Sequence, residues 1–309
     1  MIVLDEKKDL NYHKETYIAL GSFDGLHIGH LSLIEKTISL ATENNGLSMV
    51  FSFKNHPLTL VNKEIAPKLL MDNETKLEII EKLGVDISCI VEFDESFMRI
   101  EPEEFIRTLV KKYKAKGIIV GFNYRFGYKN RGDIALLKSL SREIGFALYV
   151  LNAYNYKDEV VSSTRIRECI SNGNIEESNV MLLRPYMLKG KVKEGKKIGR
   201  TIGFPTANLD YNKDFVIPKV GVYYTNVKHD SKIYKGITSV GFNPTVNGRE
   251  LTVETNILDF KKNIYGDELK IYFIERIRNE KKFNSLQELQ SQLYKDKEYA
   301  AEHKVVINS

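Results

Sequence analysis

The hydrophobic pattern of the chain changes once, near residue 183, and this change constrains the fold more than any other feature. Before it, short apolar runs such as 17–20, 47–53 and 117–121 alternate with stretches of helical periodicity. Alternation of strand and helix predicts a parallel sheet with helices on both faces. After it, short alternating runs follow one another with turn residues between them, which predicts an antiparallel sheet or a small barrel. We therefore expect an α/β domain over residues 1–183 and a β domain over residues 186–309.

The expected elements can be placed from these patterns. In the first domain we expect helices at residues 27–44, 73–83, 102–113 and 133–144 and further strands at 87–91 and 159–161. In the second domain we expect strands at 186–193, 221–228, 232–240, 250–258 and 269–277, with a hairpin turn at 229–231. A helix closes the chain at 285–305, where Ser285 and Glu288 form a capping-box pattern.

Composition narrows the class of protein. The chain of 309 residues is 42% hydrophobic and 28% charged, as in ordinary globular proteins, and it has no 18-residue apolar run, so we expect no membrane span. The N-terminus lacks the pattern of a signal peptide. Cys89 and Cys169 lie far apart, which suits a reducing compartment and predicts a cytoplasmic protein. The net charge of +5 suits anionic ligands but is too diffuse to indicate nucleic acid by itself. We do not expect nucleic acid as a partner, because the sequence has no RNP-like, helix-turn-helix or zinc-finger pattern. The oligomeric state is left open.

Residues 21–30 read GSFDGLHIGH and follow an apolar strand. His27 and His30 are three positions apart at the start of an expected helix, so they share one face. Gly29 between them lets a ligand approach the backbone. A helix N-terminus with two imidazoles suits a polyphosphate, although two surface histidines behind an ordinary glycine turn are the alternative. The candidate ATP-binding residues of this turn are Gly21, Ser22, Phe23, Asp24 and Gly29, with His27 and His30 as candidate catalytic residues.

Three further stretches follow strands of the same expected sheet. Residues 162–167 read SSTRIR, and hydroxyls at a helix start with arginines one turn later can form a second anion clamp; a solvated helix cap is the alternative. Residues 121–127 read GFNYRFG and residues 53–57 read FKNHP, so both can line a pocket, although their aromatic residues can equally be core. The candidates are Ser162, Ser163, Thr164 and Arg167 for ATP, and Asn123, Phe126 and His56 for flavin.

These motifs resemble known enzymes. The two histidines resemble the HxGH signature of α/β-phosphodiesterase nucleotidyltransferases, which have a Rossmann-like domain. The four stretches in this order resemble the adenylyltransferase module of bacterial bifunctional riboflavin kinase/FAD synthetases, which joins FMN to the AMP moiety of ATP. The resemblance implies that His27 and His30 contact the triphosphate, with residues 162–167 opposite and Asn123 toward flavin or adenine. Lys54 and Asn55 stand where the family often has Asp-Pro.

The second domain begins with a basic segment, because residues 189–200 carry six Lys or Arg and one Glu. A solvated hairpin loop is the alternative to an ATP-binding loop. The segment continues into Phe204-Pro205-Thr206-Ala207-Asn208, whose hydroxyl and amide lie two apart on one face of an extended segment. Magnesium bound to ATP takes only one or two protein oxygens, which Thr206 and Asn208 can supply. The other candidate ATP-binding residues are Gly195, Gly199 and Arg200.

Glu254 lies on an alternating run in which Val253 and Ile257 face the opposite side. A carboxylate that points away from the core near an ATP loop is a candidate general base for an alcohol, and a solvated strand residue is the alternative.

This half of the chain resembles the riboflavin kinase module of the same family. The resemblance is carried by VKEGKKIGRTIGFPTANL, GVYYTNV, VGFNPTV, VETNILDF with IYG, and IRNEKKFNSLQELQSQLYKD. It implies a six-stranded antiparallel barrel with a terminal helix, Mg²⁺ at Thr206 and Asn208, and Glu254 as the base for the ribityl 5′-hydroxyl. Arg278 and Phe283 fall in the family's flavin-side segment, and Asn256 stands where members often have His.

We therefore expect a bifunctional enzyme that converts riboflavin to FMN and FMN to FAD, with ATP and Mg²⁺ as co-substrate and cofactor. Riboflavin, FMN and ATP are the expected partners, and FMN and FAD the product ligands. Two alternatives remain at this point. One is a single-activity FMN adenylyltransferase with a degenerate kinase module, and the other is a flavin- or RNA-binding regulator that uses the basic segment.

Overall fold

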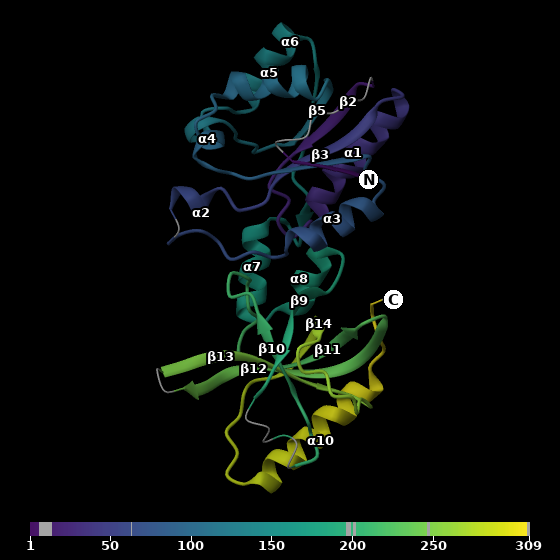
Figure 1. The fold of residues 1–309 in the computed structure, drawn as a ribbon, viewed down its shortest axis with the longest axis vertical. Coiled ribbons are helices and arrows are strands. Elements are labelled where there is room, and N and C mark those ends of the chain that lie inside the picture. Colours follow the sequence, from purple (N-terminus) through teal and green to yellow (C-terminus); the bar gives the residue numbers. More distant parts are fainter. Residues whose placement is uncertain (6–13, 63, 196–198, 200–201, 246–247, 308–309) are drawn as a thin grey trace. The chain divides into compact units, whose positions relative to one another are not determined.

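The chain forms two compact units, Met1–Ser163 and Thr164–Ser309, in a computed structural model (Figure 1). The structure describes residues 1–5, 14–62, 64–195, 199, 202–245 and 248–307. Each unit is described separately below.

The first unit is built on a parallel sheet of six strands (Figure 1). Its order across the sheet is β1 (Ile2–Leu4), β4 (Ile87–Val91), β3 (Leu47–Phe53), β2 (Thr16–Leu20), β5 (Ala115–Gly121) and β6 (Ala147–Leu151). The expected parallel sheet is confirmed. The two outer strands, β1 and β6, were not expected from the sequence, because neither is a continuous buried apolar run.

The four expected helices of this unit lie within one residue of their predicted ends. They are α1 (Ile28–Glu43), α3 (Asn73–Lys82), α5 (Pro102–Lys112) and α6 (Ile134–Ile144). Local caps explain the agreement, since the carboxylates of Asp72 and Asp133 accept the N–H groups of Thr75 and Leu136. Shorter elements complete the unit: α2 (Leu58–Val61), α4 (Glu95–Met98), the 3₁₀ turn η1 (Tyr128–Asn130) and the antiparallel pair β7 (Asn155–Tyr156) and β8 (Glu159–Val160).

Two apolar clusters sandwich the sheet, as the alternation of strand and helix predicts. Ile18 and Leu20 of β2 face one cluster, which includes buried residues of α5 and α6. Ala19 faces the other, which includes buried residues of α1 and α3. Helices therefore cover both faces, and the carboxyl edge of the sheet is left to the loops.

The second unit is a closed antiparallel barrel, so the barrel and not an open sheet is confirmed. Around the barrel the strands are β10 (Ala207–Tyr211), β13 (Gly248–Ile257), β12 (Lys232–Thr245), β11 (Gly221–His229), β14 (Glu268–Arg278) and β9 (Tyr186–Lys193). The short strand β10 closes the barrel by pairing with both β9 and β13.

Helix α10 (Leu286–Glu302) follows the barrel strands, and the hydroxyl of Ser285 accepts the N–H of Glu288 at 3.1 Å, as predicted. The Glu288 carboxylate accepts the N–H of Asn284 at 3.0 Å. The carboxylate thus reaches one residue beyond the usual capping-box partner.

Two helices, α7 (Ser163–Asn172) and α8 (Ile175–Leu182), precede the barrel in the chain. Helix α8 packs on the barrel, where the side chain of Asn179 donates to Phe273 O at 2.9 Å and accepts from Tyr186 N at 2.7 Å. The compact units therefore divide between Ser163 and Thr164, earlier than the expected boundary near residue 183. Which residues serve which reaction stays a prediction.

Candidate active sites

The loop between β2 and α1 has an unusual backbone. Phe23, Gly25 and Leu26 have φ of 49°, 80° and 39°, in the left-handed region. Phe23 and Leu26 are fully buried, so their side chains anchor this conformation in the core. Strained backbone of this kind persists only where surrounding contacts hold it and is frequent at functional sites. The side chains of Phe23 and of Asp24, which is 5% exposed, are buried and so shape the loop, and a contact of either with ATP stays a prediction.

The two predicted histidines meet at the N-terminus of α1. His27 is the N-cap, and its Nδ1 accepts the N–H of His30 at 3.3 Å. The two imidazole rings stack with centroids 3.6 Å apart. In a neutral His27 ring, acceptance at Nδ1 places the proton on Nε2. The structure thus brings together two imidazoles and the N–H groups of a 16-residue helix, an arrangement suited to phosphate.

Close packing near these histidines favours glycine. A side chain at Gly29 would contact the His27 ring at 3.3 Å, and one at Gly21 would contact the Phe23 ring at 3.1 Å. At both positions the absence of a side chain lets the loop backbone lie close to these rings.

Distant segments hold Asp24 of this loop through its carbonyl and its carboxylate. The Ser163 hydroxyl donates to Asp24 O at 2.9 Å, so the start of the SSTRIR stretch lies against the GSFDG loop. The Asp24 carboxylate accepts the N–H of Leu70 at 3.0 Å. Of the remaining residues of the stretch, Ser162 lies in the first unit, whereas Thr164 and Arg167 belong to the second.

The flavin candidates of the first unit differ in their surroundings. Asn123 is exposed just after β5. His56 is half-buried, and its Nδ1 accepts the N–H of Leu58 at 3.2 Å at the start of α2. Phe126, however, is 5% exposed and packs against Tyr124 and Phe105 in the core. Phe126 thus packs in the core, and a flavin contact for it stays a prediction.

In the barrel, the predicted metal and base residues lie together. Asn208 of β10 is the cross-strand partner of Glu254 on β13. The Thr206 hydroxyl donates to Glu254 Oε2 at 3.3 Å. Gly195 is required beside them, because a side chain there would collide with the Asn208 amide. Antiparallel register thus places a hydroxyl, an amide and a carboxylate side by side.

The basic segment is only partly described. A side chain at Gly199 would collide with the carbonyl of Phe204, and Phe204 N donates to Gly199 O at 2.8 Å, so this glycine closes a tight turn. Lys193 lies within 4 Å of both Asp210 and Glu250, at 3.9 and 3.8 Å, which indicates a surface ion-pair role. The predicted ATP-binding residue Arg200 lies outside the described residues.

A pocket of about 310 Å³ opens beside Thr206. Its far wall is the segment between β13 and β14, which the sequence interpretation did not single out as part of the site. Two lysines between aromatic residues were the available signal, since they suit an anion beside a ring system. The residues of this wall are Phe260, Lys261, Lys262, Asn263, Ile264 and Tyr265.

The two flavin candidates at and beyond the end of β14, Arg278 and Phe283, have different partners. Arg278 makes a bidentate ion pair with Asp296 of α10, with Nη2 to Oδ2 at 2.7 Å and Nε to Oδ1 at 3.0 Å. Asp296 is 2% exposed, so this pair joins the barrel to α10. Phe283 is half-buried, with Lys281 Nζ 5.6 Å from its ring centre. A flavin contact for either residue stays a prediction.

Comparison with known proteins assigns the two units. A FAD synthetase family model matches residues 9–165, and a riboflavin kinase family model matches residues 182–304. The chain belongs to the bifunctional riboflavin kinase/FMN adenylyltransferase family. Relatives of that description from Listeria monocytogenes and Bacillus subtilis are 36% and 34% identical, over 96% and 93% of this chain and 94% and 92% of their own. That from Escherichia coli K12 is 33% identical, over 92% of this chain and 91% of its own.

A solved structure shares the fold over the whole chain. It is described as a macrolide-efflux protein from Streptococcus pneumoniae, is 30% identical, and covers 98% of this chain and 100% of its own with a TM-score of 0.90. An efflux role is said of that protein only. Among the residues that the structure describes, no helix has the length and apolar character needed to cross a membrane.

Thr206 and Asn208 in the barrel of this chain fit a magnesium ion carried by ATP. Mg²⁺ prefers oxygen ligands and keeps water and phosphate in most positions, so a hydroxyl and an amide oxygen suffice. Thr206 and Asn208 offer this set beside the Glu254 carboxylate. Within the described ranges, no group of three His, Cys, Asp or Glu side chains could hold a metal ion. Such a group is typical of sites that bind a metal such as zinc through protein side chains, which differ from a site for ATP-bound Mg²⁺.

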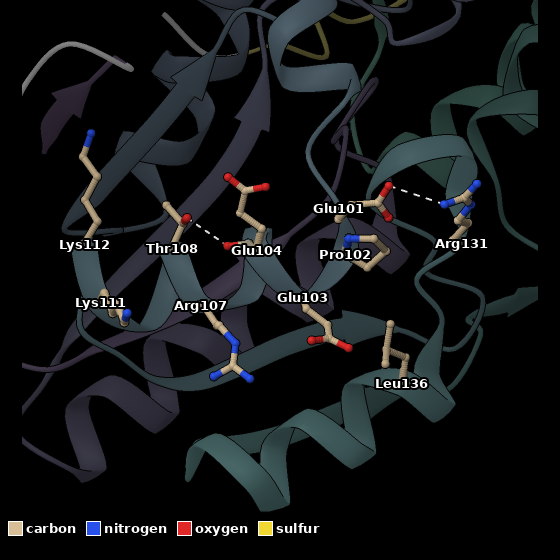
Figure 2. Close-up of a pocket in the computed structure, with 10 residues that line it drawn as sticks. All are labelled: Glu101, Pro102, Glu103, Glu104, Arg107, Thr108, Lys111, Lys112, Arg131 and Leu136. Atoms are coloured by element: carbon tan, nitrogen blue, oxygen red, sulfur yellow. Dashed lines mark hydrogen bonds and ion pairs between the residues drawn. The ribbon is translucent and has the colours of Figure 1, made fainter.

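A larger hollow, about 860 Å³, runs along α5 in the first unit (Figure 2). Some of its charged side chains form ion pairs within the protein: Arg131 pairs with Glu101 at 3.4 Å, and Arg107 pairs with Glu143. No predicted site residue lines it. The hollow therefore lies outside both candidate active sites.

Proposed function

We propose that the chain makes FAD from riboflavin in two ATP-dependent steps, with phosphorylation in the barrel and adenylylation in the α/β unit. The observation that carries this proposal is the meeting of Thr206, Asn208 and Glu254 in the barrel of a chain whose other unit stacks two histidines at a helix N-terminus. The barrel arrangement suits attack at the γ-phosphorus of ATP, and the histidine arrangement suits attack at the α-phosphorus.

In the barrel, Glu254 is the general base. It takes the proton of the ribityl 5′-hydroxyl, and that oxygen attacks the γ-phosphorus of ATP while the bond to the β-phosphate oxygen breaks and ADP leaves. Thr206 and Asn208 hold the Mg²⁺ of ATP, which neutralises phosphate charge when bound. Gly195 and Gly199 let the ATP-binding loop turn closely, and Arg200 adds a cation to it. Arg278 and Phe283 are proposed on the flavin side.

In the α/β unit, a phosphate oxygen of FMN attacks the α-phosphorus of ATP, and the bond to the bridging oxygen breaks to release pyrophosphate. The step needs alignment and charge stabilisation more than a nucleophilic side chain. His27, His30 and the N–H groups of α1 supply donors to the triphosphate. The loop residues Gly21, Ser22 and Gly29 line its path, and Ser162, Ser163, Thr164 and Arg167 are proposed as the second clamp, with Asn123 and His56 toward the flavin.

The alternatives find less support. A degenerate kinase module is not favoured, because Thr206 and Glu254 are present and in contact. A regulator that binds RNA through the basic segment is not favoured either, since Lys193 of that segment lies beside two carboxylates. We further propose a cytoplasmic location, because Cys89 and Cys169 are both buried outside any disulfide.

Two assays test the proposal. Purified protein is incubated with ATP and Mg²⁺ and either riboflavin or FMN, and the flavins are separated by chromatography. We expect FMN and FAD from riboflavin, and FAD from FMN. FAD from FMN without any FMN from riboflavin would identify a single-activity enzyme, and the absence of both products would contradict the proposal.

A further inference from the structure

Lys76 is a buried lysine at the carboxyl edge of the first unit's sheet. It lies on α3, is 5% exposed, and its Nζ donates to Ser22 O at 3.1 Å and to Phe53 O at 3.3 Å. The Ser52 hydroxyl lies 3.5 Å from the same nitrogen. A buried ammonium is costly unless such acceptors surround it. Packing alone therefore does not explain why a lysine stands at this position.

The two carbonyl groups belong to the two loops that carry the candidate site. Ser22 lies in the loop that leads to His27, and Phe53 is the last residue of β3, where the FKNHP stretch begins. The Ser52 hydroxyl also donates to Ser22 O, at 2.9 Å. One ammonium therefore joins the histidine-bearing loop to the loop beside it.

The chain before and at the start of α3 contacts the same two loops. Leu70 N donates to the Asp24 carboxylate at 3.0 Å, and the Asn73 side chain donates to Lys54 O at 2.8 Å. Burial lowers the pKa of Lys76 to about 8, and the nearby negative charge of Asp24 opposes this shift. The side chain thus remains mainly protonated at neutral pH.

We propose that Lys76 is a positioning residue for FMN adenylylation. It holds the carbonyl of Ser22 next to β3 and thereby sets where His27 and His30 stand relative to residues 53–57. The strained residues that follow Ser22 need such anchoring. Because Lys76 is enclosed, it acts through the loops and does not touch the reactants. This inference rests on the proposed adenylyltransferase activity.

The test replaces Lys76 by methionine, which keeps the length of the side chain and removes its donors. We expect the kcat for FAD formation from FMN to fall about 100-fold, because small displacements of aligned groups cost this much, with a smaller change in the KM for ATP. FMN formation by the barrel of the same molecules should stay within about twofold. The exposed Lys82, on the same helix, supplies the control Lys82→Met, which should leave both reactions unchanged.

A second variant, Ser52→Ala, removes the other donor to Ser22 O. It should lower the adenylylation kcat about tenfold, and the double variant should lose less than the product of the two effects, because both act on one carbonyl. If Lys76→Met does not fold, Ser52→Ala alone tests the positioning role. Wild-type kcat for FAD formation in folded Lys76→Met, or in Ser52→Ala if the first is insoluble, overturns the positioning role. A wild-type protein that makes no FAD instead overturns the proposed function.

Discussion

The two candidate sites of this chain fix their functional groups by different means. In the α/β unit, a loop with three left-handed residues is held by side chains that come from distant segments. In the barrel, Asn208 and Glu254 are neighbours because two paired strands place them so. A site built on strand register depends on few additional contacts, whereas a site built on a strained loop depends on each anchor. Since both lie in one chain, each reaction is the control for the other.

The largest effect is expected for Glu254→Gln, which keeps the shape of the side chain and removes the base. FMN formation from riboflavin should fall about 1,000-fold or more, in the range of general-base catalysis, while FAD formation from FMN is unchanged. Separate assays of the two reactions on one preparation check this. Equal loss of both would show that the two sites do not divide the work.

The reverse result is expected for His30→Ala. Loss of a donor to the triphosphate should slow FAD formation from FMN by about 100- to 1,000-fold, and kinase activity should persist. His303→Ala, at the end of α10, is the matched control and should leave adenylylation intact. A kinase that failed together with adenylylation in His30→Ala would contradict the comparison.

A smaller effect concerns pH and the anchor of the loop. Burial lowers the pKa of Lys76 to about 8 from a usual 10.5, so the unfolded chain holds more protons between these values. The contribution of Lys76 to the free energy of unfolding should therefore rise with pH across this window, by about 2 kcal/mol from pH 8 to pH 10. Below pH 8 the amine is charged in both states and its burial cost is fully present.

Urea unfolding of wild type and Lys76→Met at each pH measures this difference. Tyrosines such as Tyr299, whose pKa burial raises to about 12, lower stability at high pH in both proteins alike, so their effect cancels. A difference between the two proteins that does not change with pH would argue against a buried, titrating amine.

The smallest effect is expected at Asn256, two positions after Glu254. Its side chain donates to Pro205 O at 2.7 Å and so braces the segment that carries Thr206. Asn256→Asp removes this donor and should lower kinase kcat about tenfold, with FAD formation from FMN unaffected. The exposed loop residue Asn212 supplies the control Asn212→Asp. Unchanged kinase kcat in Asn256→Asp would mean that strand pairing alone positions Thr206.

Much of the architecture follows from local signals. Strands β3 and β4 have their predicted ends, because both are continuous buried runs. The helices end where caps such as Asp72 and Asp133 lie next to the periodic residues they serve. By contrast β1, β6 and β10 were not predicted as strands, since a short or half-exposed segment becomes a strand only when a neighbour pairs with it.

The candidate sites divide in the same way. The sequence alone indicated the two fold classes, the histidine pair at a helix start, and Thr206 and Asn208 on one face, because spacing along one element sets which side chains share a face. That Glu254 lies opposite Asn208 depends on the pairing of β10 with β13. Only the tertiary structure decided that Lys76 is buried against a loop 54 positions away, that Phe126 is core and that Arg278 pairs with Asp296. These outcomes depend on contacts between distant segments, which no local pattern records.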